Sequence, residues 1–235
     1  MNVETKLFIW WLLFGGAHVL GSASLNRAPL VRALGLKGFK GIYSLVALAT
    51  FIPLVFTYWY NRHAGDILFA TPIWTRHITE TLMLFAFLFI GLAHTNKSPA
   101  TTRAEMTGKF ESSARGILRV TRHPQNAAFA LFGLAHMASN TTNGDWIFWG
   151  GFVVFAVVSA IHQDRRLLAT GPAEFRTFYA ETSAIPFLAI LQGRQRLALR
   201  EINWGAAAGS VVLWIGLRLA HPYIIGGFAE KLATP

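Results

Sequence analysis

Long apolar runs alternate with short polar segments along the chain, a pattern typical of a membrane protein. The apolar runs cover residues 7–25, 42–60, 78–95, 124–139, 146–162 and 204–220. A helix that crosses a bilayer needs about 20 apolar residues, within a range of about 17–25. Because the fourth and fifth runs lie at or below that limit, we predict six transmembrane helices, with five as the alternative. The expected fold class is an all-α, polytopic membrane helix bundle that forms one domain over residues 1–235.

The polar connections are predicted to be mainly loops that contain a few short helices. The segments 26–41 and 61–77 are expected to be loops, and 140–145 is expected to be a tight Asn/Gly turn. The connection 96–122 is expected to hold a short amphipathic helix over 108–116, and a tail is expected from His221. The longest connection, 164–203, is expected to hold an interfacial helix over 172–179 and a half-buried piece over 185–191.

The basic residues are concentrated in alternate loops. Loops 1, 3 and 5 carry four, six and six Lys and Arg, whereas loop 2 carries two and loop 4 carries none. Short loops rich in Lys and Arg stay on the cytoplasmic side. We therefore expect a multi-pass protein of the bacterial inner membrane with loops 1, 3 and 5 in the cytoplasm.

Composition supports this interpretation and excludes several classes of protein. Hydrophobic residues make up 53% of the chain and charged residues only 14%, with a mean hydropathy of +0.41. The net charge of +10 comes from residues between apolar runs, so membrane topology explains it and no nucleic-acid partner is expected. The chain has no cysteine, which excludes disulfides and thiolate metal sites. The first apolar run has no basic region before it and no clear cleavage site, so we expect it to be retained.

Two histidines are predicted to lie inside the membrane. His18 lies about 16 Å from the outer edge of the first run, and His136 about 18 Å from the inner edge of the fourth. Either residue alone could simply bond a carbonyl of a neighbouring helix. Two histidines at similar depth among Phe residues suggest instead a pair of ligands to haem iron. Glycines beside them, Gly15, Gly16 and Gly133, would let a flat ligand approach the backbone.

A second group of candidate residues lies at the predicted cytoplasmic edge. It consists of Arg122 and His123 in one connection and His162, Arg165 and Arg166 in another. Arginine binds carboxylates in a bidentate way, so these arginines could hold haem propionates. The alternative for each arginine is an ordinary positive charge that flanks a membrane helix.

One further pair of charged residues falls within predicted spans. Glu80 and Arg218 both lie in outer halves of spans, where they could form a structural ion pair. No group is predicted to be catalytic from these patterns alone.

The motifs together resemble the NnrU family of membrane proteins. The matching elements are Thr121-Arg122-His123-Pro124-Gln125, Leu134-Ala135-His136, His162 with Asp164-Arg165-Arg166, Thr182 to Phe187, Gln192-Gly193-Arg194, His18, and Gly38 to Leu45. The resemblance covers nearly the whole chain. It implies a polytopic inner-membrane protein associated with denitrification, alongside nitrite and nitric oxide reduction.

The resemblance also implies a cofactor. A plant and algal relative with the same elements, 15-cis-zeta-carotene isomerase, carries a b-type haem with histidine ligands. It isomerises a C=C bond in a redox-gated way. Carried over, this implies that His18, His123, His136 and His162 are the functional histidines. The choice of His18 and His136 as the metal ligands rests on their predicted depth.

A more distant similarity is to the isoprenylcysteine carboxyl methyltransferases. Arg122-His123-Pro124 and Ile185-Pro186 match that group, but Asp164-Arg165 stands where two glutamates are expected. Three functions therefore stay open. The first is a haem b protein that acts by redox-linked chemistry on a lipid-soluble substrate or partner, such as a polyene. The second is a non-catalytic accessory factor for nitrogen-oxide reduction, and the third is methyl transfer from S-adenosylmethionine.

Overall fold

The computed structural model describes residues 1–100, 104 and 113–233 and confirms an all-α fold, with no strand among these residues. Six longer helices form the body: α1 (Val3–Ser22), α2 (Ser24–Tyr60), α3 (Thr75–Leu92), α6 (Pro124–Ser139), α7 (Asn143–Thr170) and α10 (Trp204–Ala233). Shorter elements are α5 (Ile117–Val120), α8 (Ala173–Glu181), α9 (Leu188–Leu191) and the 3₁₀ turn η1 (Leu199–Glu201).

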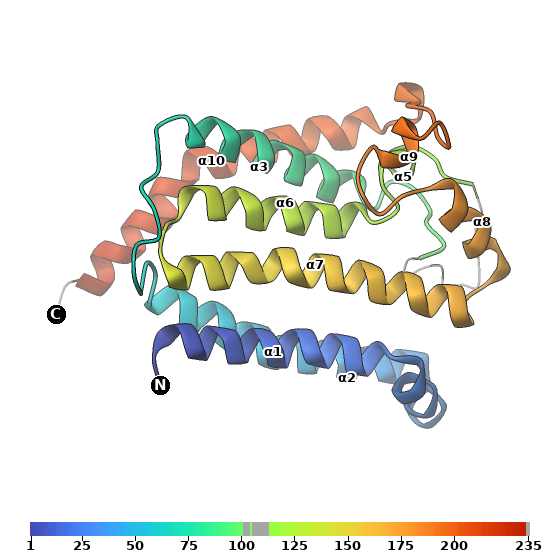
Figure 1. Cartoon of the computed structure of the whole chain (residues 1–235), viewed down its shortest axis with the longest axis horizontal. Coiled ribbons are helices and arrows are strands. Elements are labelled where there is room, and N and C mark those ends of the chain that lie inside the picture. The colour runs from blue at the N-terminus through green and yellow to red at the C-terminus, as the bar shows by residue number, and fades with distance from the viewer. Residues whose placement is uncertain (101–103, 105–112, 234–235) are drawn as a thin grey trace.

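The longer helices pack side by side in the order α10, α3, α6, α7, α1 and α2, as Figure 1 shows. Both labelled chain ends lie at one end of the bundle, which we call the terminal end (Figure 1). The short helices α5, α8 and α9 gather at the opposite end, which we call the capped end (Figure 1). Each end therefore has its own set of connections, and the long helices join the two.

Four of the described helices are long and apolar enough to cross a membrane. They are Val3–Ser22, Arg27–Tyr60, Thr75–Leu92 and Asn143–Thr170. Large apolar side chains on their outer faces are exposed, as expected for contact with lipid. The chain is therefore a multi-pass membrane protein, whereas the number of six spans and the loop orientation stay predictions.

The fourth predicted run is confirmed as α6, with the same bounds, Pro124 to Ser139. Pro124 begins the helix, where its missing N–H costs no hydrogen bond. The fifth run was predicted too short, because α7 extends from Asn143 to Thr170. Thr142 and Asp145 form a capping box at its start, so the second half of the predicted 140–145 turn belongs to the first helical turn.

Two other predicted boundaries are wrong. The segment 26–41 is helical and forms the first part of α2, which bends at Gly35, where φ is 67° and ψ is 164°. Only glycine adopts that backbone geometry without strain, so α2 consists of two helical segments that meet at a kink at Gly35. The tail expected from His221 is wrong too, because α10 continues past it through Pro222 to Ala233.

The short elements of the capped end agree with prediction where the structure describes them. Helix α8 confirms that this connection holds a helix, whereas its place at the membrane interface stays a prediction; α9, with its fully buried Ala189, confirms the half-buried piece. The predicted helix over 108–116 lies mostly outside the described residues. A core of apolar side chains joins these short elements to the long helices: Phe89, Leu92, Ala114, Ile117, Leu118, Val120, Ala128, Leu167, Phe175, Phe178 and Ala207.

Glycines allow neighbouring long helices to approach closely. A Cβ atom added at Gly133 of α6 would lie 2.6 Å from the carbonyl oxygen of Trp149 in α7. A Cβ atom at Gly151 of α7 would overlap the indole of Trp11 in α1. The separations of α6, α7 and α1 therefore depend on these two missing side chains.

Ion pairs link helices that are distant in sequence. The predicted pair between Glu80 of α3 and Arg218 of α10 is confirmed, with Arg218 Nη2 donating to Glu80 Oε1 over 2.7 Å. At the capped end, Arg119 donates from Nε and Nη2 to the two carboxylate oxygens of Glu201, each over 2.8 Å. This bidentate pair, with the Gly116 amide, lowers the pKa of Glu201 to about 2.

The low pKa of Glu201 predicts a pH-dependent contribution to stability. The pKa of an unfolded glutamate is about 4.3. The ion pair between Arg119 and Glu201 therefore stabilises the fold fully above that pH and less as the pH falls toward 2. Glu201→Gln should cost about 1 kcal/mol at pH 7 and clearly less at pH 3. Thermal unfolding in detergent measures the difference from the parent, with exposed Glu174→Gln as the control. A difference that is equal at both pH values would contradict the prediction.

Candidate functional site

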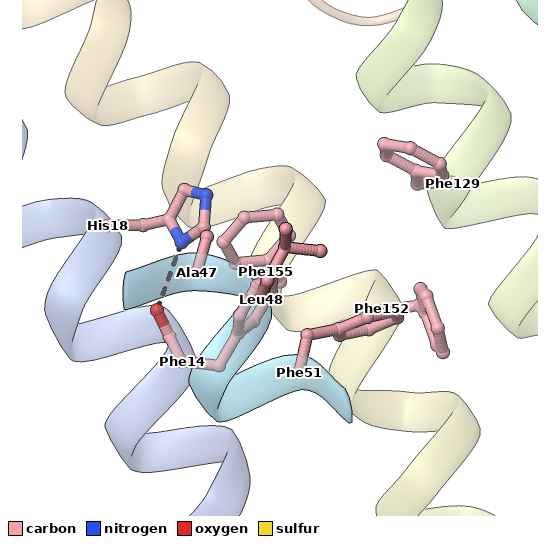
Figure 2. A pocket seen from close by; sticks show the side chains of 8 residues that line it. All are labelled: Phe14, His18, Ala47, Leu48, Phe51, Phe129, Phe152 and Phe155. Atoms are coloured by element: carbon pink, nitrogen blue, oxygen red, sulfur yellow. Dashed lines mark hydrogen bonds between the residues drawn. The ribbon is translucent and has the colours of Figure 1, made fainter. Parts of the chain in front are cut away.

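His18 lies on α1 and faces the space between α1, α2 and α7 (Figure 2). Its Nδ1 atom donates to the carbonyl oxygen of Phe14, one turn earlier, over 3.0 Å. The ring lies between aromatic side chains, with centroid distances of 5.0 Å to both Tyr43 and Phe155. Because Nδ1 carries the proton, Nε2 keeps a free electron pair, which is the form that binds a metal.

An apolar cavity of about 300 Å³ adjoins this histidine (Figure 2). Its wall comes from four long helices: Phe14 and His18 of α1, Ala47, Leu48 and Phe51 of α2, Phe129 of α6, and Phe152 and Phe155 of α7. His18 is the one polar side chain among these residues. A site of this size and character suits a flat or extended apolar ligand. Leu48 also reaches the outer surface, where it is 52% exposed.

A second apolar cavity, of about 160 Å³, lies on the other side of two shared side chains. Phe129 and Phe152 line both cavities, and Phe132 of α6 lines the second. Figure 2 places Phe129 across from His18, with Phe152 between the two helices. The two cavities are therefore neighbours separated by aromatic rings, on the faces of α7 that meet α1 and α6.

His136 lies near the end of α6, beside the second cavity's wall. Its Nδ1 atom donates to the carbonyl oxygen of Phe132 over 2.9 Å, so its Nε2 atom is free in the same way as that of His18. Its ring lies on the indole of Trp149, with 4.0 Å between centroids and 21° between planes. In each case the carbonyl belongs to the histidine's own helix, not to a neighbouring one.

The two histidines meet α7 at different heights. His18 contacts Phe155 and His136 contacts Trp149, six residues earlier in α7. Six residues correspond to about 9 Å along the axis and about 120° around it. The depth estimates from sequence placed both rings at one level. In the structure, the two rings contact α7 at different heights and on different faces of the helix. Their joint role as metal ligands stays a prediction.

Arg122 and His123 form a buried cluster with Asp164 of α7. Arg122 donates from Nε to Asp164 Oδ2 over 2.9 Å, and His123 donates from Nε2 to Oδ1 over 2.8 Å. Arg122 also donates to the Thr182 carbonyl and lies 4.1 Å from the centre of the Tyr179 ring. This cluster ties the start of α6 to α7 and to the segment after α8. The side chains of Arg122 and His123 are thus engaged by protein groups.

The other predicted site residues lie on α7 near the capped end. His162 follows Phe155 by seven residues and therefore shares its face of the helix. The Nε2 atom of His162 is buried without a hydrogen-bond partner among the described residues. Arg165 is exposed and Arg166 is half-buried. Of the candidate residues predicted at the cytoplasmic edge, Arg122 and His123 are the two that bind the same carboxylate, that of Asp164.

The donor atoms present fit a haem. Neutral imidazole with a free Nε2 atom is a common ligand of haem iron, and His18 offers this atom beside an apolar, aromatic cavity. Among the residues that the structure describes, no group of three or more His, Asp or Glu side chains could hold a metal ion.

Several side chains of the site were not identified from the sequence. The role of Asp164 depends on partners 41 and 42 residues away, and no local pattern shows such a contact. The cavity wall depends on Phe side chains from helices distant in sequence. Phe152 and Phe155 could have been noted as neighbours on one face of an apolar run, but their partners could not.

Comparison with known proteins gives a family and two relatives. The family model described as "NnrU protein" matches residues 6–228. The chain is similar to the chloroplastic 15-cis-zeta-carotene isomerase of Zea mays, with 25% identity over 223 residues, which covers 93% of this chain and 60% of the relative. The corresponding protein of Arabidopsis thaliana is 25% identical over 238 residues, which covers 95% of this chain and 61% of the relative.

The chain thus spans about three-fifths of the length of these relatives. No solved structure matches it. The family match, in contrast, includes all of α2, α3, α6 and α7, most of α1 and α10, and the residues around both cavities. On that match, the protein belongs to the NnrU family.

Proposed function

We propose that this protein is a membrane-embedded cis–trans isomerase of a polyene similar to zeta-carotene, and that it uses a haem b. The relatives named as 15-cis-zeta-carotene isomerases support the reaction class. The apolar cavity beside His18 is the single observation that carries the proposal. It offers an aromatic wall for a conjugated chain and one free imidazole nitrogen for iron.

His18 is the first ligand in this proposal, and His136 is the second candidate. The Phe14 carbonyl keeps the His18 proton on Nδ1, and the Phe132 carbonyl does the same for His136. Both residues therefore keep Nε2 available for iron without any change of tautomer. His162, whose buried Nε2 atom has no partner among the described residues, is the third histidine to test. Arg166, on the same part of α7, is a candidate to pair with a haem propionate.

The aromatic wall would serve the substrate. Cis–trans isomerisation adds and removes no atoms, so the site needs no water as a reactant. Phe51, Phe152 and Phe155 would hold the conjugated chain and exclude water. When bound, haem would supply reversible one-electron chemistry that lowers the barrier to rotation about a double bond.

An absorbance spectrum and an isomer analysis test the proposal. The purified protein in detergent, after haem supplementation during expression, should show a Soret band that shifts on reduction. His18→Ala should abolish this band, and His136→Ala should abolish or shift it. The exposed residue His77 provides the control, since His77→Ala should leave the band unchanged. Cells that accumulate 15-cis-zeta-carotene should show conversion to the trans isomer when they express the parent protein.

The combined outcomes distinguish the alternatives. Absence of both the Soret band and the conversion would reject the proposal. A Soret band without conversion would favour the accessory role in nitrogen-oxide reduction, with haem as a carried group. Conversion that survives in His18→Ala would reject the assignment of His18.

A further inference from the structure

A chain of contacts runs from the surface of the terminal end to His136. His63 Nδ1 donates to Asp145 Oδ2 over 3.0 Å, and the Tyr58 hydroxyl donates to Asp145 Oδ1 over 2.8 Å. The indole Nε1 atom of Trp149 donates to the Tyr58 hydroxyl oxygen over 2.9 Å. Trp149 in turn lies flat against the His136 ring. The four contacts link the exposed side chain of His63 to the half-buried side chain of His136.

The second member of this chain, Asp145, is held rigidly. Its side chain is fully buried and accepts from the Thr142 hydroxyl over 2.8 Å. The loops around it are joined by backbone hydrogen bonds, from Gly144 N to Ala64 O over 3.0 Å and from Leu68 N to Thr141 O over 2.8 Å. The carboxylate therefore has a fixed place at the start of α7, where it also caps the helix.

Tyr58 is held as rigidly, and its hydroxyl has only one way to bond. Its ring stacks on Phe148, with 4.0 Å between centroids and 1° between planes, and the residue is 5% exposed. A carboxylate can only accept, so the hydroxyl proton points to Asp145. An indole N–H can only donate, so the hydroxyl oxygen accepts from Trp149. The hydroxyl therefore fixes the rotation of the indole.

We infer that Tyr58 is a positioning residue for His136, and that it acts through Trp149. The indole sets the plane of the His136 ring, while the Phe132 carbonyl sets its tautomer. Without the Tyr58 hydroxyl, the half-buried indole N–H of Trp149 loses its acceptor, and the indole rotates to find another. The His136 ring then loses its flat support. This inference rests on the proposed function only in giving His136 a use, since the contacts themselves involve no cofactor.

¹⁵N NMR of the haem-free protein in detergent, labelled selectively at histidine and tryptophan, tests the inference. In Tyr58→Phe, the ring resonances of His136 should shift, because its ring loses the flat contact with the indole, and the Trp149 indole resonance should shift as well. The His18 resonances should stay in place. Tyr43→Phe is the matched control, because it removes a tyrosine hydroxyl that bonds the His18 carbonyl over 3.0 Å. It should leave the His136 resonances unchanged.

The inference fails if the His136 resonances of Tyr58→Phe match those of the parent while the Trp149 resonance moves. Should Tyr58→Phe not fold, Trp149→Phe keeps an aromatic ring beside His136 and removes the indole N–H, and it should shift the same His136 resonances. An unshifted His136 in that variant also overturns the inference. None of these spectra depends on haem. The outcome of this test is therefore independent of whether the protein binds a haem.

Discussion

Replacing Asp164 by asparagine should destabilise the protein by about 3–5 kcal/mol, the usual cost of breaking a buried ion pair by removal of one partner. The side chain of Asp164 is buried and accepts from both Arg122 and His123. The neutral amide would leave the Arg122 guanidinium without a counter-charge in an apolar environment. Denaturant or thermal unfolding in detergent measures the loss.

A matched variant and a double variant sharpen this test. Asp66→Asn changes an exposed carboxylate and should have almost no effect. The double variant Arg122→Leu with Asp164→Leu removes both charges and should recover part of the lost stability. If Asp164→Asn were as stable as Asp66→Asn, the cluster would not contribute to the fold in the way its geometry indicates.

Gly133→Ala should destabilise the bundle by about 1–3 kcal/mol, in the range of overpacked cores. The added methyl group would lie 2.6 Å from the backbone carbonyl oxygen of Trp149, which cannot rotate away as a side chain can. The α6 and α7 helices would have to separate. Such a shift would also disturb the stacking of His136 on Trp149.

The control is a glycine in a long helix that has free space around it. Gly209 of α10 is exposed, and a Cβ atom there meets nothing within 4 Å. Since alanine favours a helix over glycine by about 1 kcal/mol, Gly209→Ala should be neutral or stabilising. Unfolding of both variants in the same detergent gives the comparison. Equal effects would show that the α6–α7 contact is not as tight as described.

The apolar pattern predicted the long helices well where the ends carry clear signals. The bounds of α6 agree because Pro124 fits only the first turn of a helix and Asn140 follows its last residue. The pattern failed at 26–41, where basic residues and glycines interrupt the apolar run. This segment is helical on both sides of a kink at Gly35, and a single positive φ leaves no trace in hydrophobic periodicity.

The candidate site was predictable only in part. The depth of His18 and His136 along their own helices follows from counting residues, but the relative shift of α1 and α6 does not. That shift is set by contacts such as Gly133 with Trp149 and Gly151 with Trp11, which join residues 16 and 140 positions apart. The contacts of the arginines could not be predicted either. An arginine that flanks a membrane span has the same sequence pattern whether its side chain faces water or a buried carboxylate.

One consequence follows from the position of Leu48, which both lines the larger cavity and is about half exposed on the outer face of α2. The cavity thus reaches the hydrocarbon phase directly. A water-insoluble compound dissolved in the bilayer would meet this opening by lateral diffusion, without crossing an aqueous layer. Occupancy would then depend on the mole fraction of the compound in the lipid, so diluting a vesicle suspension with buffer should leave it unchanged, whereas adding empty vesicles should lower it.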